Sequence, residues 1–346
     1  MTASSTAPET RPRLQLCSLV SEASGEDPIG SAWSTPRFVA IELPLPWPYD
    51  MLSGTNVPPG LKDFVTGLYA QGIYWGMLGI APDPALVVEG HTRVIVFDQI
   101  PMPSTGYAVR EFLFPTAQLG DLLTRFAGDE ADPAIAPFQV ERSATTRDLF
   151  TCTHGAIDAC CAKFGYPVFR ELKRLAADAE TDTRVWRCTH FGGHRFAPTV
   201  LEMPSGRYWG RLTGPHLAGI VTHDLPGSAM RAAYRGWALF PHPLAQVAEG
   251  EAFRRGGWAW AECAVEATGI PEDPEAITGT ITLTYRHPEG ETGAITIEVI
   301  PDGTIETMGS SSSPETMDAQ QYRCVVTAVS PADGILGHDP ARPAAD

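Results

Sequence analysis

The sequence predicts an α/β protein whose C-terminal part is rich in β-strands. Apolar, β-branched runs typical of strands alternate with helix-like spacing of apolar residues over residues 13–260. Residues 277–330 are instead rich in strand-like segments, and residues 277–300 alternate polar and apolar side chains with the two-residue period of strands. The chain has 346 residues, and a domain averages about 150 residues, so we expect more than one domain.

The first half of the chain is expected to form an α/β domain over residues 13–137. RFVAIELPLP, TRVIVFDQI and AVREFLFP have the composition of strands, whereas GLKDFVTGLYAQG and TAQLGDLLTRFA have the apolar spacing of helices. The strands are expected at 37–46, 92–100 and 108–115, and the helices at 60–72 and 116–127. The acidic segment GDEADPAIAP at 128–137 is the best candidate for a linker.

The second half is expected to form another α/β domain over residues 138–260. Asp158 is placed to cap a helix that runs on through 167–180, with Pro167 at or near a fresh first turn. The other expected elements are strands at 147–153 and 183–189, a hairpin that turns at Ser205-Gly206, and helices near 215–222 and 243–255.

A β-rich extension is expected over residues 261–334. Residues 277–300 alternate with period two about a Glu-Gly-Glu turn, which predicts a hairpin. The segment SSSSPETMD (310–318) is expected to be a loop, and QYRCVVTAV (321–329) a last strand. Residues 1–12 and 335–346 are expected to be disordered tails.

Composition argues against two classes of partner. The formal net charge of −16 disfavours nucleic acid, whose phosphates are bound by clusters of Lys and Arg. No window reaches the ~18 consecutive apolar residues of a membrane span. The N-terminus also lacks the apolar core of a signal peptide, so we expect a cytoplasmic protein. Thiols stay reduced in that compartment, and clustered Cys and His then indicate metal ligands or redox thiols.

Two segments of the second half concentrate such residues. CTHGAIDACC (152–161) holds three of the seven cysteines, and CTHFGGHRFAPTV (188–200) places His190 and His194 four residues apart. Two histidines at this spacing can bind zinc from one helix face. However, each of the two glycines between them costs a helix about 1 kcal/mol relative to Ala, so a loop is expected.

The chemistry of these residues fits two kinds of metal centre. Two thiolates and two imidazoles satisfy a tetrahedral zinc ion. They also satisfy a [2Fe–2S] cluster in which two histidines replace two cysteines on one iron. The spacing by itself does not separate the two centres.

A family resemblance favours the cluster. The order strand, helix, strand, loop, hairpin, helix resembles a thioredoxin-like unit, and FAPTVLEMPSG resembles its cis-proline segment, which implies a cis bond before Pro198. The two segments that carry cysteine and histidine resemble the sucrase/ferredoxin-like family, whose C-terminal domain is similar to thioredoxin-like [2Fe–2S] ferredoxins. PWPYDML upstream and RGWALFPHPLAQVAEGEAF downstream fit the same family, so the resemblance covers most of residues 15–260.

The resemblance implies a thioredoxin-like ferredoxin domain preceded by a second α/β domain, which is a degenerate copy of the same fold or a docking domain. The family's C-x8-C and H-x3-H pairs carry over to four cluster ligands, Cys152, Cys161, His190 and His194. Cys160 adjoins Cys161 and is an alternative ligand. Residues expected near the ligands are His154, Gly192, Gly193, Arg195 and Pro198. The other cysteines, Cys17, Cys188, Cys263 and Cys324, are expected to be core residues.

The implied function is proton-coupled transfer of single electrons, with a reductase and an electron acceptor as partner proteins. We therefore expect an electron carrier rather than an enzyme with its own substrate. No acid and nucleophile pair of a glycosidase is identified, so sucrase activity has no support. The alternatives are a zinc-binding structural or interaction module at the same four residues and a thioredoxin-like thiol-disulfide oxidoreductase, which the absence of a C-x-x-C motif disfavours.

Overall fold

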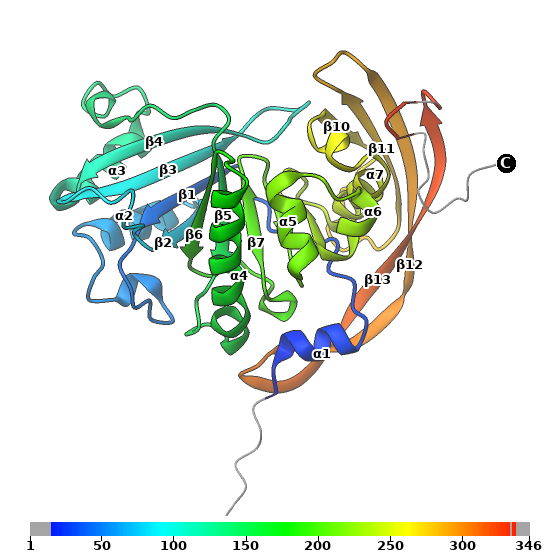
Figure 1. The fold of residues 1–346 in the computed structure, drawn as a ribbon, viewed down its shortest axis with the longest axis horizontal. Coiled ribbons are helices and arrows are strands. Elements are labelled where there is room, and N and C mark those ends of the chain that lie inside the picture. Colours follow the sequence, from blue (N-terminus) through cyan, green and yellow to red (C-terminus); the bar gives the residue numbers. More distant parts are fainter. Residues whose placement is uncertain (1–14, 333, 337–346) are drawn as a thin grey trace, which may run out of the picture.

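A computed structural model describes residues 15–332 and 334–336 of the chain. The expected tails, 1–12 and most of 335–346, lie outside the described residues, although Leu336 is fully buried. The described part is a mixed α/β structure with one nine-stranded sheet and a separate four-stranded antiparallel sheet (Figure 1). The expected α/β class with a β-rich C-terminal part is confirmed.

The first half of the large sheet follows the sequence patterns closely. Its strands are β1 (Arg37–Glu42), β2 (Gly76–Ile80), β3 (His91–Gln99) and β4 (Tyr107–Pro115), and its helices are α2 (Leu61–Ala70) and α3 (Leu119–Gly128). Among these elements only β2 was not predicted, because GMLGI is short and contains two glycines. An apolar core that includes Phe64, Val96 and Phe126 joins α2 and α3 to the sheet.

The second half contributes five strands to the same sheet. The strands are β5 (Arg147–Cys152), β6 (Thr183–Cys188), β7 (Val200–Met203), β8 (Arg207–Trp209) and β9 (Tyr234–Trp237). The helices are α4 (Ala159–Asp178), α5 (Gly214–Thr222), α6 (Gly227–Met230) and α7 (Pro243–Ala261). The predicted hairpin around Ser205-Gly206 is confirmed as β7 and β8. The sequence patterns did not indicate α6 or β9, which have only four residues each.

The two halves repeat one strand order. The sheet runs β4-β3-β1-β2-β6-β5-β7-β8-β9, so β1 to β4 correspond to β5 to β8. In each half a parallel pair is followed by antiparallel neighbours. The halves meet where Ile80 of β2 pairs with Cys188 of β6. One sheet therefore continues across the segment 128–137, where we placed a linker.

Helix α4 corrects one prediction. Asp158 is its N-cap, as expected, and accepts a hydrogen bond from the Cys160 backbone N–H at 2.8 Å. Pro167 does not begin a fresh first turn, because α4 is one helix of 20 residues with Pro167 inside it. The amphipathic α4 buries Val168 and Leu172, and this packing outweighs the cost of an internal proline.

The C-terminal part forms a long arm. Its strands are β10 (Ala264–Thr268), β11 (Gly279–Arg286), β12 (Thr292–Ser310) and β13 (Ser313–Ser330). The predicted loop at 310–318 is wrong, because β13 already begins at Ser313 and pairs with β12 almost to the tip. Backbone pairing along the hairpin overrides the weak strand propensity of SSSSPETMD.

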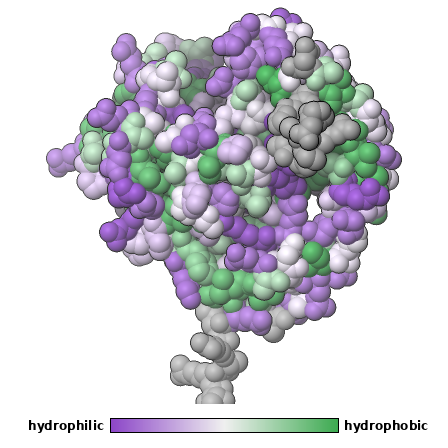
Figure 2. Space-filling model, turned by 45° about the vertical axis from the view of Figure 1, so that its right-hand side comes forward, coloured by the Kyte–Doolittle hydropathy of each residue, from purple (hydrophilic) through white to green (hydrophobic). Residues whose placement is uncertain are grey.

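The tip of this hairpin reaches helix α1 (Cys17–Ala23), which the sequence patterns also did not predict (Figure 1). A small apolar cluster joins Leu16 and Cys17 to Cys160 of α4, to Ala197 and to Met308 of β12. Residues from both ends of the chain thus close over the start of α4. Figure 2 shows that the visible surface is mostly hydrophilic, with hydrophobic residues gathered at its lower end, at the level of α1.

Candidate metal centre

Two neighbouring strands bring the predicted ligands together. Cys152 is the last residue of β5, and its direct partner in the parallel register is Cys188, the last residue of β6. The segments that follow two parallel strands leave the sheet at the same edge, so CTHGAIDACC and CTHFGGHRFAPTV become neighbours. Gly165 permits α4 to lie close to this edge, because a Cβ there would be 2.0 Å from the Cys152 carbonyl oxygen.

Three of the predicted ligands converge directly. The Cys152 Sγ lies 3.8 Å and the Cys161 Sγ 3.7 Å from Nδ1 of His190. Both cysteines are buried, whereas His190 is half-buried. The hydrogen bond from the Cys161 thiol lowers the pKa of Cys152, and the same bond raises the pKa of Cys161. Cys152 is therefore the thiol of this pair that ionises first.

His194 adjoins this group from the other end of the loop. Its ring centre lies 5.3 Å from that of His190. Its Nδ1 lies 3.4 Å from the Cys17 Sγ and 3.5 Å from Oδ2 of Asp158. Burial lowers the pKa of His194, which favours the neutral imidazole that binds metals. These contacts place His194 with Cys17 and Asp158 in a second group of side chains suited to a metal ion.

The predicted alternative ligand, Cys160, points elsewhere. Its Sγ lies 3.6 Å from the Cys17 Sγ and accepts a hydrogen bond from the Ser18 hydroxyl at 3.3 Å. The bond from Cys17, together with that from Ser18, lowers the pKa of Cys160 to about 6. Adjacent residues of a helix lie about 100° apart around its axis, so Cys160 and Cys161 face different groups. Only Cys161 is grouped with Cys152 by the geometry.

Two glycines shape the loop that carries the histidines. Gly192 and Gly193 both have positive φ angles, 91° and 77°. A Cβ on Gly193 would also lie 2.3 Å from the guanidinium of Arg235. Both the backbone conformation and the neighbouring side chain therefore require glycine at position 193.

The remaining predicted neighbours take defined positions. His154 is buried and holds the loop, since its Nδ1 accepts from the His190 backbone N–H and its Nε2 lies 2.8 Å from the Pro48 carbonyl oxygen. Burial lowers the pKa of His154, consistent with a neutral ring. Arg195 donates to Glu26 at 2.8 Å. The bond before Pro198 is cis, as the resemblance implied.

Sequence reasoning missed several residues of this region. Cys17 is buried as expected, but it also contacts His194 and Cys160. Ser311, at the hairpin tip, donates to Asp158 from its backbone N–H and its hydroxyl, both at 2.8 Å. Local spacing contains no signal for such contacts, because they join segments that are far apart in the sequence. The other cysteines are core residues as expected, with Cys188 and Cys263 buried and Cys324 half-buried.

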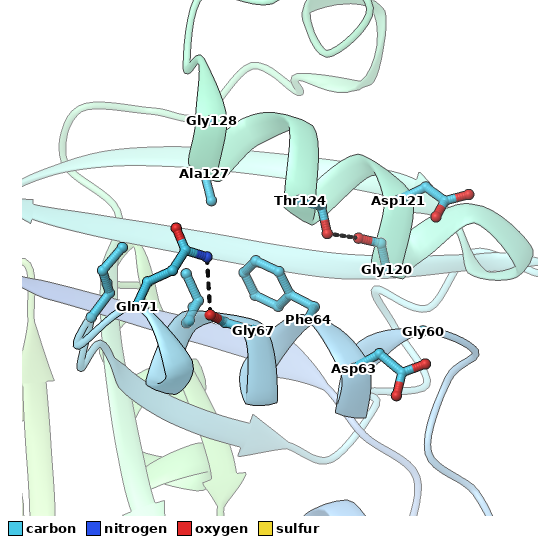
Figure 3. Close-up of a pocket in the computed structure, with 12 residues that line it drawn as sticks. Gly60, Asp63, Phe64, Gly67, Gln71, Gly120, Asp121, Thr124, Ala127 and Gly128 are labelled. Atoms are coloured by element: carbon cyan, nitrogen blue, oxygen red, sulfur yellow. Dashed lines mark hydrogen bonds between the residues drawn. The ribbon is translucent and has the colours of Figure 1, made fainter.

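A groove in the first half offers no comparable chemistry. It lies between α2 and α3 (Figure 3). The Gln71 amide donates to the Gly67 carbonyl and the Thr124 hydroxyl to the Gly120 carbonyl, so these polar groups are bound to their own helices. Within the part of the chain that the structure describes, each group of side chains suited to a metal ion contains one histidine of the segment 188–200 instead.

Fold and site together define an α/β protein with a cysteine- and histidine-lined centre at the ends of two parallel strands. The chain matches the sucrase/ferredoxin-like family over residues 28–236. It belongs to this family. None of its described helices is long and apolar enough to cross a membrane.

Two curated relatives share a common name. The chain is 24% identical over 139 residues to "Altered inheritance of mitochondria protein 32" of Clavispora lusitaniae, which covers 38% of this chain and 51% of the relative. It is 29% identical over 94 residues to the protein of that name from Debaryomyces hansenii, which covers 25% of this chain and 34% of the relative. The chain thus spans about half of the first relative and a third of the second. No solved structure matches it.

Proposed function

We propose that the protein is an electron carrier that binds a [2Fe–2S] cluster through Cys152, Cys161, His190 and His194. One observation carries the proposal: two buried cysteine sulfurs lie within 3.8 Å of the His190 imidazole, whose ring neighbours that of His194. We also propose that the second half is a thioredoxin-like unit and the first half a degenerate copy of it, since the two share one strand order.

The donor set fits this cluster. Thiolates and imidazoles are the ligands of [2Fe–2S] centres with mixed ligation. Cys152 and Cys161 form one pair of donors, and His190 and His194, with ring centres 5.3 Å apart, form the other. A mononuclear zinc ion would instead need all four donor atoms within about 2.3 Å of one point. Cys152, Cys161 and His190 also form a group suited to zinc, and the first experiment separates the two centres.

When bound, such a cluster supplies reversible one-electron transfer. The histidine ligands would add proton uptake and release to this electron transfer. A ligand imidazole has a second nitrogen that can gain or lose a proton, and Nδ1 of His194 is 3.5 Å from the Asp158 carboxylate. Two histidine ligands therefore couple electron uptake to proton uptake, so the reduction potential is expected to fall as pH rises.

The exposure of the ligands supports a role in transfer between proteins. Both cysteines are buried, whereas His190 and His194 are partly exposed. The histidine side is thus where a reductase and an electron acceptor would dock. The net charge of −16 favours partners with basic surfaces. Seven free cysteines fit a reducing compartment such as the cytoplasm.

The first experiment is a visible absorption spectrum of protein purified without oxygen, with iron, sulfide and zinc quantified in the same sample. A red-brown protein with two irons and two sulfides per chain is expected. A colourless protein with one zinc per chain would replace the proposal with the zinc-binding alternative. In a cluster-loaded protein, a potential that stays constant over the whole pH range in which the protein remains folded and keeps its cluster would exclude two histidine ligands.

A further inference from the structure

The guanidinium of Arg235, on β9, is a buried charge beside the ligand loop. Arg235 is only 1% exposed. Its hydrogen bonds go to neutral acceptors: Nη1 donates to the Gly192 carbonyl at 3.1 Å, Nη2 to the Ser31 carbonyl at 2.7 Å and Nε to the Ser31 hydroxyl at 3.1 Å. Among the described residues, no carboxylate forms an ion pair with Arg235.

The other deeply buried arginines differ in this respect. Arg207, also 1% exposed, pairs with Glu249 at 2.8 Å, and Arg93, 7% exposed, pairs with Glu111. Removing a charge from water costs several kcal/mol, so a buried arginine normally faces a negative partner. Burial lowers the pKa of Arg235 to about 10, which still leaves the side chain charged at neutral pH.

Aromatic rings supply part of the compensation. The guanidinium carbon of Arg235 lies 5.3 Å from the centre of the Tyr208 ring and 5.6 Å from that of Phe196. The negative face of a ring attracts a cation, but each such contact contributes only about 0.5–2 kcal/mol. The contacts with the two rings therefore offset only part of the cost of burying the guanidinium, and a nearby negative group would stabilise it further.

The position of Arg235 indicates that the negative group would lie at the loop that carries His190 and His194. The guanidinium touches Gly192 and Gly193, which separate the two histidines in the loop. The ligand loop 190–194 is therefore the part of the proposed centre that the buried charge of Arg235 faces. Arg195, the arginine next to His194 in the sequence, cannot serve in the same way, because Glu26 neutralises it at 2.8 Å.

We infer that the buried positive charge of Arg235 stabilises the reduced form of the proposed centre. The inference rests on the proposed function. A [2Fe–2S] cluster with two thiolate and two neutral imidazole ligands is electrically neutral when both irons are ferric. It becomes singly negative when it accepts one electron from a donor. A fixed cation in a low-dielectric site favours the negative form, so Arg235 raises the reduction potential.

The test compares three variants of the full-length chain by redox titration without oxygen, followed by visible absorption. Arg235→Gln removes the charge, and Arg235→Lys keeps the charge but loses the planar fork. Arg231→Gln is the matched control, because it changes the net charge equally, lies close by in the sequence and already has Asp27 as partner at 2.9 Å. Iron and sulfide per chain are quantified for every sample.

Arg235→Gln is expected to lower the equilibrium constant for reduction about tenfold, which is a fall of 59 mV for a one-electron couple. Arg235→Lys and Arg231→Gln are each expected to change the equilibrium constant for reduction by less than about threefold. The reduction potential of these two variants should therefore shift by less than about half of the change expected for Arg235→Gln. A Gln variant that keeps its cluster and its potential would overturn the inference.

Loss of the cluster from the Gln variant is also informative. In that case, an Arg235→Lys variant that holds the cluster would support a role for the positive charge. If neither Arg235→Gln nor Arg235→Lys holds the cluster, the inferred charge role is refuted. A wild-type protein without a cluster would instead refute the proposed function, so the two failures are distinguishable.

Discussion

Two adjacent cysteines at the start of α4, Cys160 and Cys161, direct their sulfur atoms towards different groups. Cys160 and Cys161 are neighbours, yet the Cys161 Sγ lies 3.7 Å from His190 and the Cys160 Sγ lies 3.6 Å from Cys17. Their chemical roles therefore differ although both residues are buried. Cys161 belongs to the proposed ligand set, and Cys160 to the contact between α4 and α1.

Serine substitutions at the two positions should separate these roles. Cys161→Ser removes a proposed ligand, and we expect it to lose the visible absorption and most of the bound iron. Cys160→Ser should retain both, because its sulfur faces Cys17, Ser18 and Ser311 instead. Absorbance and iron content per chain measure the outcome. Retention of the cluster by Cys161→Ser and its loss in Cys160→Ser would reverse the ligand assignment.

Glu202 of β7 is a buried carboxylate away from the proposed centre. Burial alone would raise the pKa of Glu202, but the charge of Arg147, 2.6 Å away, and the contact with Nε2 of His223 at 3.4 Å lower it well below its usual value. Glu202 thus stays ionised in the folded protein over the whole neutral range. Its ion pair stabilises the fold above the unfolded-state pKa of about 4.3, and this contribution disappears as pH falls below that value.

Glu202→Gln is therefore expected to cost about 3 kcal/mol of unfolding free energy at pH 7, because it leaves Arg147 without its partner. The difference from the wild-type protein should narrow below about pH 4, as the pH falls towards the folded-state pKa of Glu202. Urea denaturation at both pH values measures this. An equal difference at the two pH values would show that the cost comes from packing rather than from charge.

At the scale of elements, the hairpin of β12 and β13 acts as a clamp on the site. Its tip residue Ser311 donates twice to Asp158 and accepts from the Cys17 backbone N–H at 3.0 Å. Thr307 donates to Glu26 at 3.0 Å, and Met308 packs on the cluster that contains Cys17. The arm therefore joins α1 to the N-terminus of α4, at the side of the centre where His194 lies.

Ser311→Ala should weaken this clamp. The substitution removes the hydroxyl bond to the Asp158 carboxylate and the acceptor for the Cys17 N–H, and a hydrogen bond to a charged group contributes about 1.5–3 kcal/mol. We expect a loss of about 2 kcal/mol and faster amide exchange in α1. Hydrogen exchange read by mass spectrometry gives both the place and the size of the effect. Ser312→Ala, at an exposed neighbour on the same tip, is the control.

At the scale of the whole molecule, the net charge should affect encounters with charged redox reagents. A charge of −16 attracts cationic reagents and repels anionic ones over about the Debye length, which is ~10 Å at 0.1 M salt. The partly exposed histidines lie on a surface subject to this field. Electron exchange should therefore depend on ionic strength with a sign set by the charge of the reagent.

Stopped-flow oxidation of the reduced protein can test this with two small oxidants. Added salt should slow the reaction with hexaammineruthenium(III), a cation, and speed the reaction with ferricyanide, an anion. Rates that respond to salt in the same direction for both oxidants would show that the field of the whole protein does not act at the centre. The two oxidants serve as each other's control.

The elements with strong local patterns were predictable, and those without were not. Residues 60–72 and 92–100 carry clear helix and strand periods and form α2 and β3. The four-residue β9 has too few positions to show a period, although it carries Arg235. The segment 310–318 favours a loop by composition, yet pairing along β12 makes most of it a strand. Tertiary context overrides local propensity in such segments.

The proposed ligands could be named from the sequence because their types and spacing within CTHGAIDACC and CTHFGGHRFAPTV resemble those of a family. Their surroundings could not, because the residues that contact the ligand segments come from distant parts of the chain. These residues are Cys17, Ser31, Arg235 and Ser311.

By itself the sequence determined the α/β class, the two cysteine- and histidine-rich segments and the acidic charge, which depend on composition and local order. Only the tertiary structure decided that Cys161 rather than Cys160 faces Cys152, and that a buried arginine lies beside the ligand loop. Both outcomes depend on side-chain direction and on contacts between distant segments, which exist only once the chain has folded.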